Sequence, residues 1–416
     1  MKRKRLILSV SAALLFSSAA SLYFHFQIFF SVLIFGGLVY MFYFLDPKGP
    51  AIFTNPGVFT DMTLLFLIFL FIPVFFFILG GGKASSRFDT SLPEKDAFKN
   101  NFVFREALIR ANSFLKVKLF GVSAVPKVII GKDGWLYQAR ESESFQPRQG
   151  GYFSSVQPFT NRELREWKQA LEKRYRWCES RGMFYLFILA PDKSSIYPEY
   201  LPDGLRPFYN RSRLDQLAAF LKTHSPVPVL NLKEVLIEAK KEREVYYKTD
   251  SHWNEYGACI ASAAIFDYLK QALDLPGETG AFSAARYRVR KRKPRGGNLA
   301  VMLTLENSVF REDKFKLLPR FKSSVKKGRM KTVKVKLSSS IQAHLTETRN
   351  AAFRNAVMLH DSFGRKLKFF LSEYFNRILY LRDWGFGFHS DVLEAENPRI
   401  VLDEMAEHFL YNKRLL

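Results

Sequence analysis

The chain has 416 residues, 48% of them hydrophobic, and its mean hydropathy of only -0.10 indicates that the apolar residues are concentrated in one part of the chain. Lysine and arginine outnumber aspartate and glutamate by 63 to 39, and the net charge of +24 favours anionic partners, among which the apolar segments make nucleic acid the weakest choice. Two cysteines are too few for a disulfide framework or a metal cluster, so we expect no nucleic acid, no metal and no other cofactor.

Residues 1–82 have the pattern of a membrane region. A basic start, Lys2–Arg5, precedes an uncharged apolar run from Leu6 to Leu45, which suits about two helices at roughly 20 residues each. Thr63 to Leu79 is a third apolar run. We therefore expect about three transmembrane helices, with the N-terminus inside and the chain after Leu79 outside. The alternative is that the first apolar segment is a cleaved signal peptide, which leaves the same orientation.

Residues 83–130 are expected to be a connector followed by an amphipathic helix. Leu108, Ala111, Leu115 and Leu119 recur at helical spacing. We expect this helix to pack on the domain that follows rather than to lie on lipid. The topology places residues 131–416 on the periplasmic side of a bacterial cytoplasmic (inner) membrane, and membrane lipid is an expected partner.

Residues 131–416 alternate short apolar runs with amphipathic helical patterns. A capping box of Thr160 and Glu163 begins one helix, and Gly182 ends it. Each cysteine falls in a predicted helix, where we expect buried free thiols, although a single disulfide is the alternative. Strands that alternate with helices predict a three-layer α/β/α sheet. The predicted strands are Phe184–Leu189, Val227–Leu230, Val245–Tyr247, Ala356–Leu359, Ile378–Leu381 and Ile400–Leu402, with helices over Lys233–Lys241 and Met405–Leu416.

A basic segment from Arg286 to Lys336 interrupts this alternation. Thr332–Leu337 alternates apolar and basic residues and predicts an edge strand. The segment is either a solvated surface or a cationic track for an anionic glycan or the membrane surface.

The segment Tyr247–Asn254, with the sequence YKTDSHWN, holds a candidate catalytic pair. Asp250 and His252 are two residues apart, and on an extended segment such side chains point the same way. A carboxylate placed there holds an imidazole in one tautomer and stabilises its charged form. Asn254 is expected to cap the helix that follows, and Trp253 either shapes an acceptor pocket or packs in the core.

A second candidate is Ala356–Gly364, with the sequence AVMLHDSFG. A buried strand there runs into a turn at Asp361 and Ser362, and a helix follows. Such a serine lies at the carboxyl edge of the sheet, where α/β proteins place their sites, and the helix N-terminus favours a developing oxyanion. The alternative is that Ser362 is an ordinary helix N-cap.

Together these stretches resemble the SGNH hydrolase-like domain of the alginate O-acetyltransferases of the AlgX/AlgJ type, over roughly residues 98–416. Five short blocks follow the family order: GKDGWLY at 131–137, APDKSSIYPEYLP at 190–202, TDSHW at 249–253, DSF at 361–363 and NPRIVLDE at 397–404. The resemblance implies Ser362 as nucleophile, His252 as general base and Asp250 as the residue that orients the base.

The resemblance also points to residues that contact substrate. Lys193 and Tyr197 fall on the family loop near the site, where they either bind substrate or stabilise the loop. Asn298, in the segment GGNLA at 296–300, is a candidate oxyanion donor. With Trp253, these are the candidate substrate-binding residues.

The leading hypothesis is a membrane-anchored O-acetyltransferase that acetylates an extracytoplasmic polysaccharide through an acetyl-serine intermediate. Its implied partners are a polysaccharide acceptor and a membrane-bound O-acyltransferase that supplies acetyl groups. The alternatives are a polysaccharide acetyl esterase and a non-catalytic glycan-binding or assembly subunit. His360 stands where SGNH enzymes usually have glycine. Its imidazole either competes with His252 as base or crowds the oxyanion hole, which keeps the non-catalytic alternative open.

Overall fold

The computed structural model describes residues 105–139, 158–203, 212–275, 284–329, 341–383 and 385–411, and the fold is that of these ranges. The predicted transmembrane runs, the connector before residue 105 and the predicted edge strand at 332–337 lie outside them. Within the described ranges, no helix is both long enough and apolar enough to span a bilayer.

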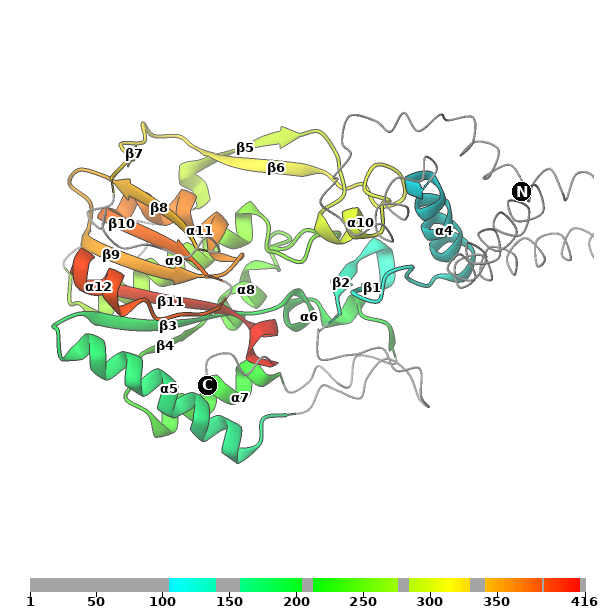
Figure 1. Cartoon of the computed structure of the whole chain (residues 1–416). Coiled ribbons are helices and arrows are strands. Elements are labelled where there is room, and N and C mark those ends of the chain that lie inside the picture. The colour runs from blue at the N-terminus through cyan, green and yellow to red at the C-terminus, as the bar shows by residue number, and fades with distance from the viewer. Residues whose placement is uncertain are drawn as a thin grey trace, which may run out of the picture. The chain divides into compact units, whose positions relative to one another are not determined.

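A seven-stranded sheet with the order β4, β3, β11, β9, β10, β8, β7 forms the centre of the fold (Figure 1). Its first five strands are parallel, and the last two extend it as an antiparallel edge. The central strands are buried on both faces, as is usual for parallel sheets covered by helices. The strands are β3 (Phe184–Ala190), β4 (Val229–Asn231), β7 (Lys326–Lys327), β8 (Gln342–Glu347), β9 (Phe353–His360), β10 (Phe375–Arg382) and β11 (Ile400–Ala406).

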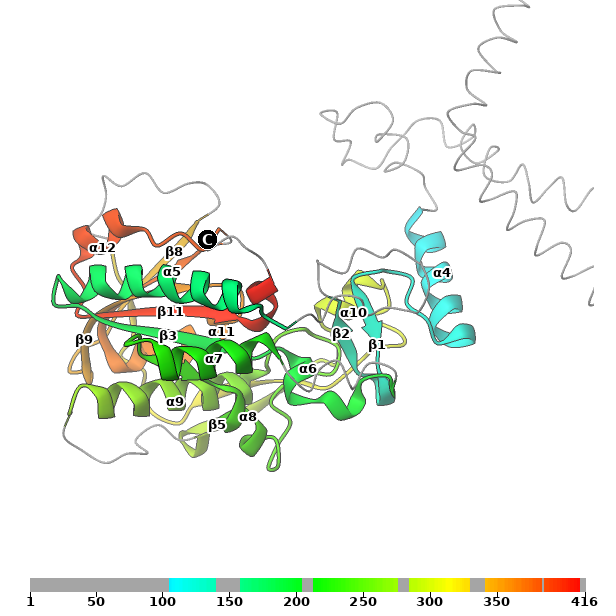
Figure 2. The same cartoon turned by 90° about the horizontal axis from the view of Figure 1, so that it is seen from below.

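Helices cover both faces of this sheet, as Figure 2 shows. One layer contains α5 (Asn161–Glu179), α7 (Arg213–His224) and α12 (Ser390–Glu396), and the other contains α8 (Lys233–Ala239), α9 (Glu255–Ala272) and α11 (Gly364–Leu371). Alternate strand residues serve the two layers, so that Phe187 packs with the first and Ile188 with the second. The predicted three-layer α/β/α architecture is confirmed.

The local signals that begin and end two helices are confirmed. Thr160 and Glu163 form both hydrogen bonds of the capping box at α5, and Gly182 follows the helix with a φ of 67°. Asn254 accepts a hydrogen bond from the backbone N–H of Gly257 and so caps α9. The two cysteines are buried free thiols, as expected, and burial raises the pKa of each to about 12.

Two small β hairpins lie apart from the main sheet. β1 (Val128–Ile130) and β2 (Leu136–Gln138) pair around the turn η2 (Lys132–Gly134), and they share an apolar cluster with α10 (Asn298–Met302). β5 (Tyr287–Arg292) pairs with β6 (Lys314–Pro319) within the basic segment. The remaining short helices are α6 (Lys193–Ile196), η3 (Pro198–Tyr200), η5 (Ala284–Arg286), η6 (Ser372–Tyr374) and η7 (Glu407–Tyr411).

The amphipathic helix before this domain forms and packs on the domain as predicted, with Val117 against the cluster of β1, β2 and α10, but it does so through a different face. α4 spans Arg105–Phe120, and the predicted packing face is exposed: Leu108 is 43% exposed, Leu115 44% and Leu119 68%. Ser113, on the opposite side of the helix, is buried. Helical spacing identified the apolar stripe correctly, but the contacting side of the helix is the other one.

Two predicted elements are wrong. Val245–Tyr247 is no sheet strand; it makes only an isolated bridge from Tyr246 to Trp253, because its apolar side chains are buried under α9 rather than in the sheet. The predicted closing helix from Met405 is also wrong at its start. Met405 and Ala406 still pair with β3, so the strand continues through them and only the short η7 follows.

Candidate active site

The fold brings Asp250, His252 and Ser362 together. The first two lie in the irregular segment before α9, here called the 247–254 loop, and Ser362 lies in the turn between β9 and α11. His252 Nε2 lies 2.8 Å from Ser362 Oγ, and His252 Nδ1 lies 2.8 Å from Asp250 Oδ1. The three side chains therefore form one hydrogen-bonded row, in the order in which the sequence predicted their interaction.

Asp250 is held as a carboxylate in this row. Burial raises its pKa, but the hydrogen bonds and charge of His252, with the charge of Lys366, outweigh burial and hold the pKa well below the ordinary value. An ionised Asp250 accepts a hydrogen bond from the Nδ1–H of His252 and so leaves Nε2 free to accept a hydrogen bond from the Ser362 hydroxyl. The side chains of His252 and Asp250 are 26% and 23% exposed, so a substrate has access to the row.

Lys193 supports the 247–254 loop from below the sheet edge. Its Nζ donates to the carbonyl oxygens of Tyr247, Lys248 and Asp250 at 3.0, 2.7 and 2.7 Å. Burial lowers the pKa of this ammonium to about 7, against the opposing charges of Glu312 and Asp250. Lys193 is buried and its donors are used by the loop backbone, so of the two roles that the sequence left open the structure favours loop stabilisation over substrate contact.

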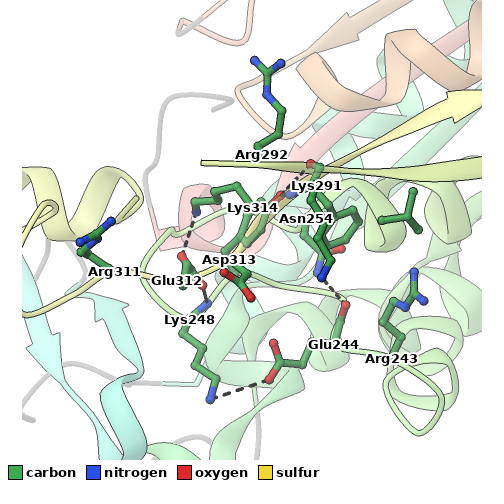
Figure 3. Close-up of a pocket in the computed structure, with 13 residues that line it drawn as sticks. Arg243, Glu244, Lys248, Asn254, Lys291, Arg292, Arg311, Glu312, Asp313 and Lys314 are labelled. Carbon is green, nitrogen blue, oxygen red and sulfur yellow. Dashed lines mark hydrogen bonds and ion pairs between the residues drawn. The ribbon is translucent and has the colours of Figure 1, made fainter. Parts of the chain in front are cut away.

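Glu312 holds the same loop from the side of the basic segment, as Figure 3 shows. Its carboxylate accepts from the backbone N–H of Lys248 at 2.7 Å and of Thr249 at 3.2 Å, and from the Thr249 hydroxyl. It also pairs with Lys314 at 2.8 Å. Sequence reasoning missed this residue, because no motif marks it in the basic segment.

The segment before α10 packs directly on Asp250. Asn298 Oδ1 accepts from the Ser251 backbone N–H at 2.8 Å, its Nδ2 donates to Ser251 Oγ at 2.8 Å, and its backbone N–H donates to Asp250 Oδ2 at 3.2 Å. The backbone of Gly297 lies so close to Asp250 that a Cβ at position 297 would be 2.5 Å from the Cβ of Asp250. The structure places Asn298 as a support of Asp250 and Ser251, and an oxyanion role for it stays a prediction.

Trp253 and Tyr197 are core residues. Trp253 is fully buried and packs edge-on against Phe363 with ring centroids 5.0 Å apart. Tyr197 is 4% exposed, and its hydroxyl accepts from the Val245 backbone N–H at 2.9 Å. Neither ring has a free face, so of the alternatives that the sequence left open the structure favours core packing for Trp253 and loop support for Tyr197. Both shape the loop from beneath.

The turn that presents Ser362 is tied to the neighbouring strand β11. The buried carboxylate of Asp361 accepts from the backbone N–H of Phe363 at 2.8 Å and of Ala406 at 2.7 Å, and the Asp361 N–H donates to Glu404 at 3.2 Å. Burial raises the pKa of Asp361 and, more strongly, that of Glu404. Ser362 is not an N-cap, because α11 begins at Gly364 after Phe363, with no side-chain cap.

His360 does not compete with His252 in this arrangement. It is buried, and its Nδ1 lies 2.6 Å from the carbonyl oxygen of Asp361. Burial lowers its pKa to about 3, so the ring stays neutral. His252 is therefore the imidazole in contact with Ser362.

A second carboxylate and imidazole pair lies beneath the Ser362 turn. His408 Nδ1 lies 2.7 Å from Asp192 Oδ1, and the His408 ring centroid is 5.9 Å from that of Phe363. Burial lowers the pKa of His408, but the charges of Asp192, Asp361 and Glu407 outweigh it and raise the pKa overall. No motif marked this pair in the sequence. Across the described ranges, no group of three or more His, Cys, Asp or Glu side chains is placed to hold a metal ion.

A three-layer α/β/α domain with an Asp, His, Ser row at the carboxyl edge of its sheet has the architecture of an SGNH hydrolase-like protein. Residues 128–334 match the family model described as SGNH hydrolase-like domain, acetyltransferase AlgX. The chain therefore carries an SGNH hydrolase-like domain of the AlgX/AlgJ type, and the family predicted from the sequence is confirmed.

Similar proteins bear the same family names. The chain is 26% identical over 195 residues to the probable alginate O-acetylase AlgJ of Pseudomonas syringae pv. tomato, which covers 46% of this chain and 45% of that protein. The match to AlgJ of Pseudomonas aeruginosa is 25% identical over 197 residues, 47% of this chain and 44% of the relative. Each match thus spans less than half the length of the curated relative.

Two solved structures are also similar. Bacillus cereus PatB1 aligns with a TM-score of 0.49 at 16% identity, over 70% of this chain and 98% of that one. The O-acetyltransferase domain of Pseudomonas putida AlgJ aligns with a TM-score of 0.43 at 18% identity, over 69% of this chain and 92% of that one.

Proposed function

We propose that this protein is a membrane-anchored O-acetyltransferase that acetylates an extracytoplasmic polysaccharide through an acetyl-serine intermediate. The observation that carries the proposal is the row of Asp250, His252 and Ser362, with contacts of 2.8 Å on both sides of His252. The names of the AlgJ relatives support acetyl transfer to a polysaccharide. His252 acts as general base, Asp250 keeps its tautomer, and Ser362 is the nucleophile.

In the first half-reaction, Ser362 Oγ attacks the carbonyl carbon of an acetyl donor while its proton moves to His252 Nε2. The bond from that carbon to the donor's leaving oxygen breaks, and the leaving group takes the proton from His252. In the second half-reaction, His252 removes the proton of a sugar hydroxyl, whose oxygen attacks the acetyl carbon. Ser362 Oγ then leaves and recovers the proton, so that the sugar carries the acetyl group.

Water competes with the sugar hydroxyl for the acetyl-serine, and the same row of residues would serve an esterase. Transfer requires that the acceptor be held in attack geometry, which is worth effective molarities of about 10⁵ M or more.

We propose that a membrane-bound O-acyltransferase supplies the acetyl groups, and that residues 1–82 anchor the chain in the bacterial inner membrane beside that partner and its lipid. Residues 131–416 then form the periplasmic catalytic domain.

The test is to trap the intermediate. Full-length protein is incubated with a chromogenic acetyl ester, quenched and digested, and the peptide that contains Ser362 is examined by mass spectrometry. An acetyl mass on that serine, absent in Ser362→Ala, supports the proposal, as does gain of acetyl by an added oligosaccharide. Deacetylation of an acetylated polymer without transfer assigns the protein to the esterases. A wild-type protein that neither becomes acetylated nor consumes the ester leaves a non-catalytic role, and a Ser362→Ala protein that reacts like wild type refutes Ser362 as the nucleophile.

A further inference from the structure

A pocket of about 590 Å³ lies between the 247–254 loop and the β5–β6 hairpin (Figure 3). This volume is within the range of small-ligand sites, roughly 300–1,000 Å³. We propose that the pocket binds an anionic sugar unit of the acceptor, charged by carboxylate or phosphate groups, while a neighbouring unit of the same chain reacts at Ser362. That the acceptor is a polysaccharide rests on the proposed function, whereas the pocket and its charge are features of the structure itself.

The net charge of the lining residues favours an anionic ligand. Six basic and three acidic side chains line the pocket, a net formal charge of +3. Two of the acidic groups are already paired, Glu312 with Lys314 at 2.8 Å and Glu244 with Lys248 at 3.9 Å. The remaining cations, which form no ion pair with any described residue, are Arg243, Lys291, Arg292 and Arg311. Only Asp313 offsets them, so a ligand anion would meet uncompensated positive charge.

The shape and walls of the pocket favour a sugar over a nucleic acid. Phe315 and Val289 form an apolar wall beside the cations. Tyr247, the other aromatic residue, is only 6% exposed, and the ammonium of Lys314 lies 3.6 Å from its ring centroid. A single strand of nucleic acid stacks successive bases on several open aromatic faces, and the lining offers only one partly exposed aromatic ring, that of Phe315.

The pocket is joined to the reacting groups by the loop itself. Lys248 and Asn254 line the pocket, and Asp250 and His252 lie between them in sequence. Glu312 forms part of the lining and also holds the backbone of Lys248 and Thr249. A sugar unit bound here is therefore beside the residues that position His252, as a subsite for the unit next to the reacting one requires.

The β5 strand carries some cations that line the pocket and others that do not. Val289, Lys291 and Arg292 line the pocket, whereas Arg288 and Arg290 on the same strand do not. Lys291, Arg292, Arg288 and Arg290 are all exposed, so their substitution leaves the core intact. The chain thus offers two pairs of cations with equal charge, of which only one pair belongs to the lining of the pocket.

The experiment measures binding by isothermal titration calorimetry. Full-length Ser362→Ala protein in detergent is the host, so that no turnover occurs. The ligands are a uronic-acid oligosaccharide, its carboxyl-reduced neutral counterpart, a polyol-phosphate oligomer and inorganic phosphate. The pocket variant adds Lys291→Gln and Arg292→Gln, and the matched control adds Arg288→Gln and Arg290→Gln. Thermal unfolding confirms that both variants are folded.

We expect at least one of the two anionic oligomers to bind more tightly than the neutral one, and the pocket variant to weaken that binding about tenfold, because two charge-assisted contacts are lost. The control pair should change affinity less than threefold. Three results would overturn the assignment. They are equal weakening of binding by both variants, binding of the neutral oligosaccharide as tight as that of the anionic ones, and binding of inorganic phosphate alone. Failure of acetyl transfer in the separate Ser362 assay would overturn the proposed function and leave these binding results unaffected.

Discussion

Gly297→Ala tests whether the position of Asp250 controls the reaction, because it removes no functional group. An added Cβ would lie 2.5 Å from Asp250 Cβ, 2.7 Å from its Cα and 2.8 Å from its backbone N, whereas ordinary contacts begin near 3.4 Å. These are backbone and Cβ atoms that cannot rotate away, so Asp250 must move by nearly 1 Å. The φ of Gly297 is -80°, so alanine introduces no backbone strain of its own.

A displacement of about 1 Å in a catalytic constellation costs on the order of 10²-fold in rate. We therefore expect kcat for a chromogenic acetyl ester to fall about 10²-fold in Gly297→Ala, while KM changes little. Gly385→Ala is the control, since the nearest atom to its added Cβ is 3.3 Å away. If Gly297→Ala keeps wild-type kcat and remains folded, then the position of Asp250 does not govern the chemistry and our assignment of the row is refuted.

Four further predictions follow from the same contacts. Asp250→Asn should lower kcat by about 10³-fold or more, because the amide favours the wrong tautomer of His252; a rate within tenfold of wild type would contradict this. Glu312→Ala should lower the free energy of unfolding by about 3 kcal/mol in denaturant titrations, since three donors lose a charged acceptor, whereas the exposed Glu238→Ala should change it by less than about 0.5 kcal/mol. Burial lowers the pKa of Lys193 in the folded state to about 7 from 10.5, so between these pH values the folded state binds fewer protons than the unfolded state. The free energy of unfolding should therefore rise with pH across that window. Urea titrations at a series of pH values should show this rise in the wild type and not in Lys193→Met. A phosphatase fused after Lys83 should be active and a fluorescent protein fused there dark, and the opposite pattern would refute the proposed topology.

The sheet and its helices could be predicted because both follow from local patterns. Phe184–Ala190 is a continuous apolar run, and Thr160 with Glu163 is a complete capping box. Val245–Tyr247 misled because it packs against α9, the helix that follows it in the chain, and not in the sheet, and an apolar run alone does not distinguish the two cases. The exposed stripe of α4 misled for a related reason: periodicity identifies an apolar face but not its partner.

The three residues of the hydrogen-bonded row could be predicted, but their supports could not. Asp250, His252 and Ser362 belong to short motifs whose spacing carries chemical meaning. Lys193 lay in a family block, yet the sequence did not show that its ammonium would donate to three carbonyl oxygens of the 247–254 loop. Glu312 had no motif at all, because a carboxylate that accepts from backbone N–H groups needs no particular neighbour in sequence.

These supports explain how a loop without regular secondary structure can hold Asp250 and His252 in place. The loop accepts backbone hydrogen bonds from Leu136, Leu299 and Ala300. Side chains also hold it on three sides: Lys193 from the start of α6, Asn298 from the start of α10, and Glu312 from the segment before β6. Two of these three residues belong to the basic segment that interrupts the α/β alternation. That segment is therefore packed into the α/β domain rather than lying apart from it, and Lys248 and Glu312 belong both to this supporting network and to the lining of the pocket.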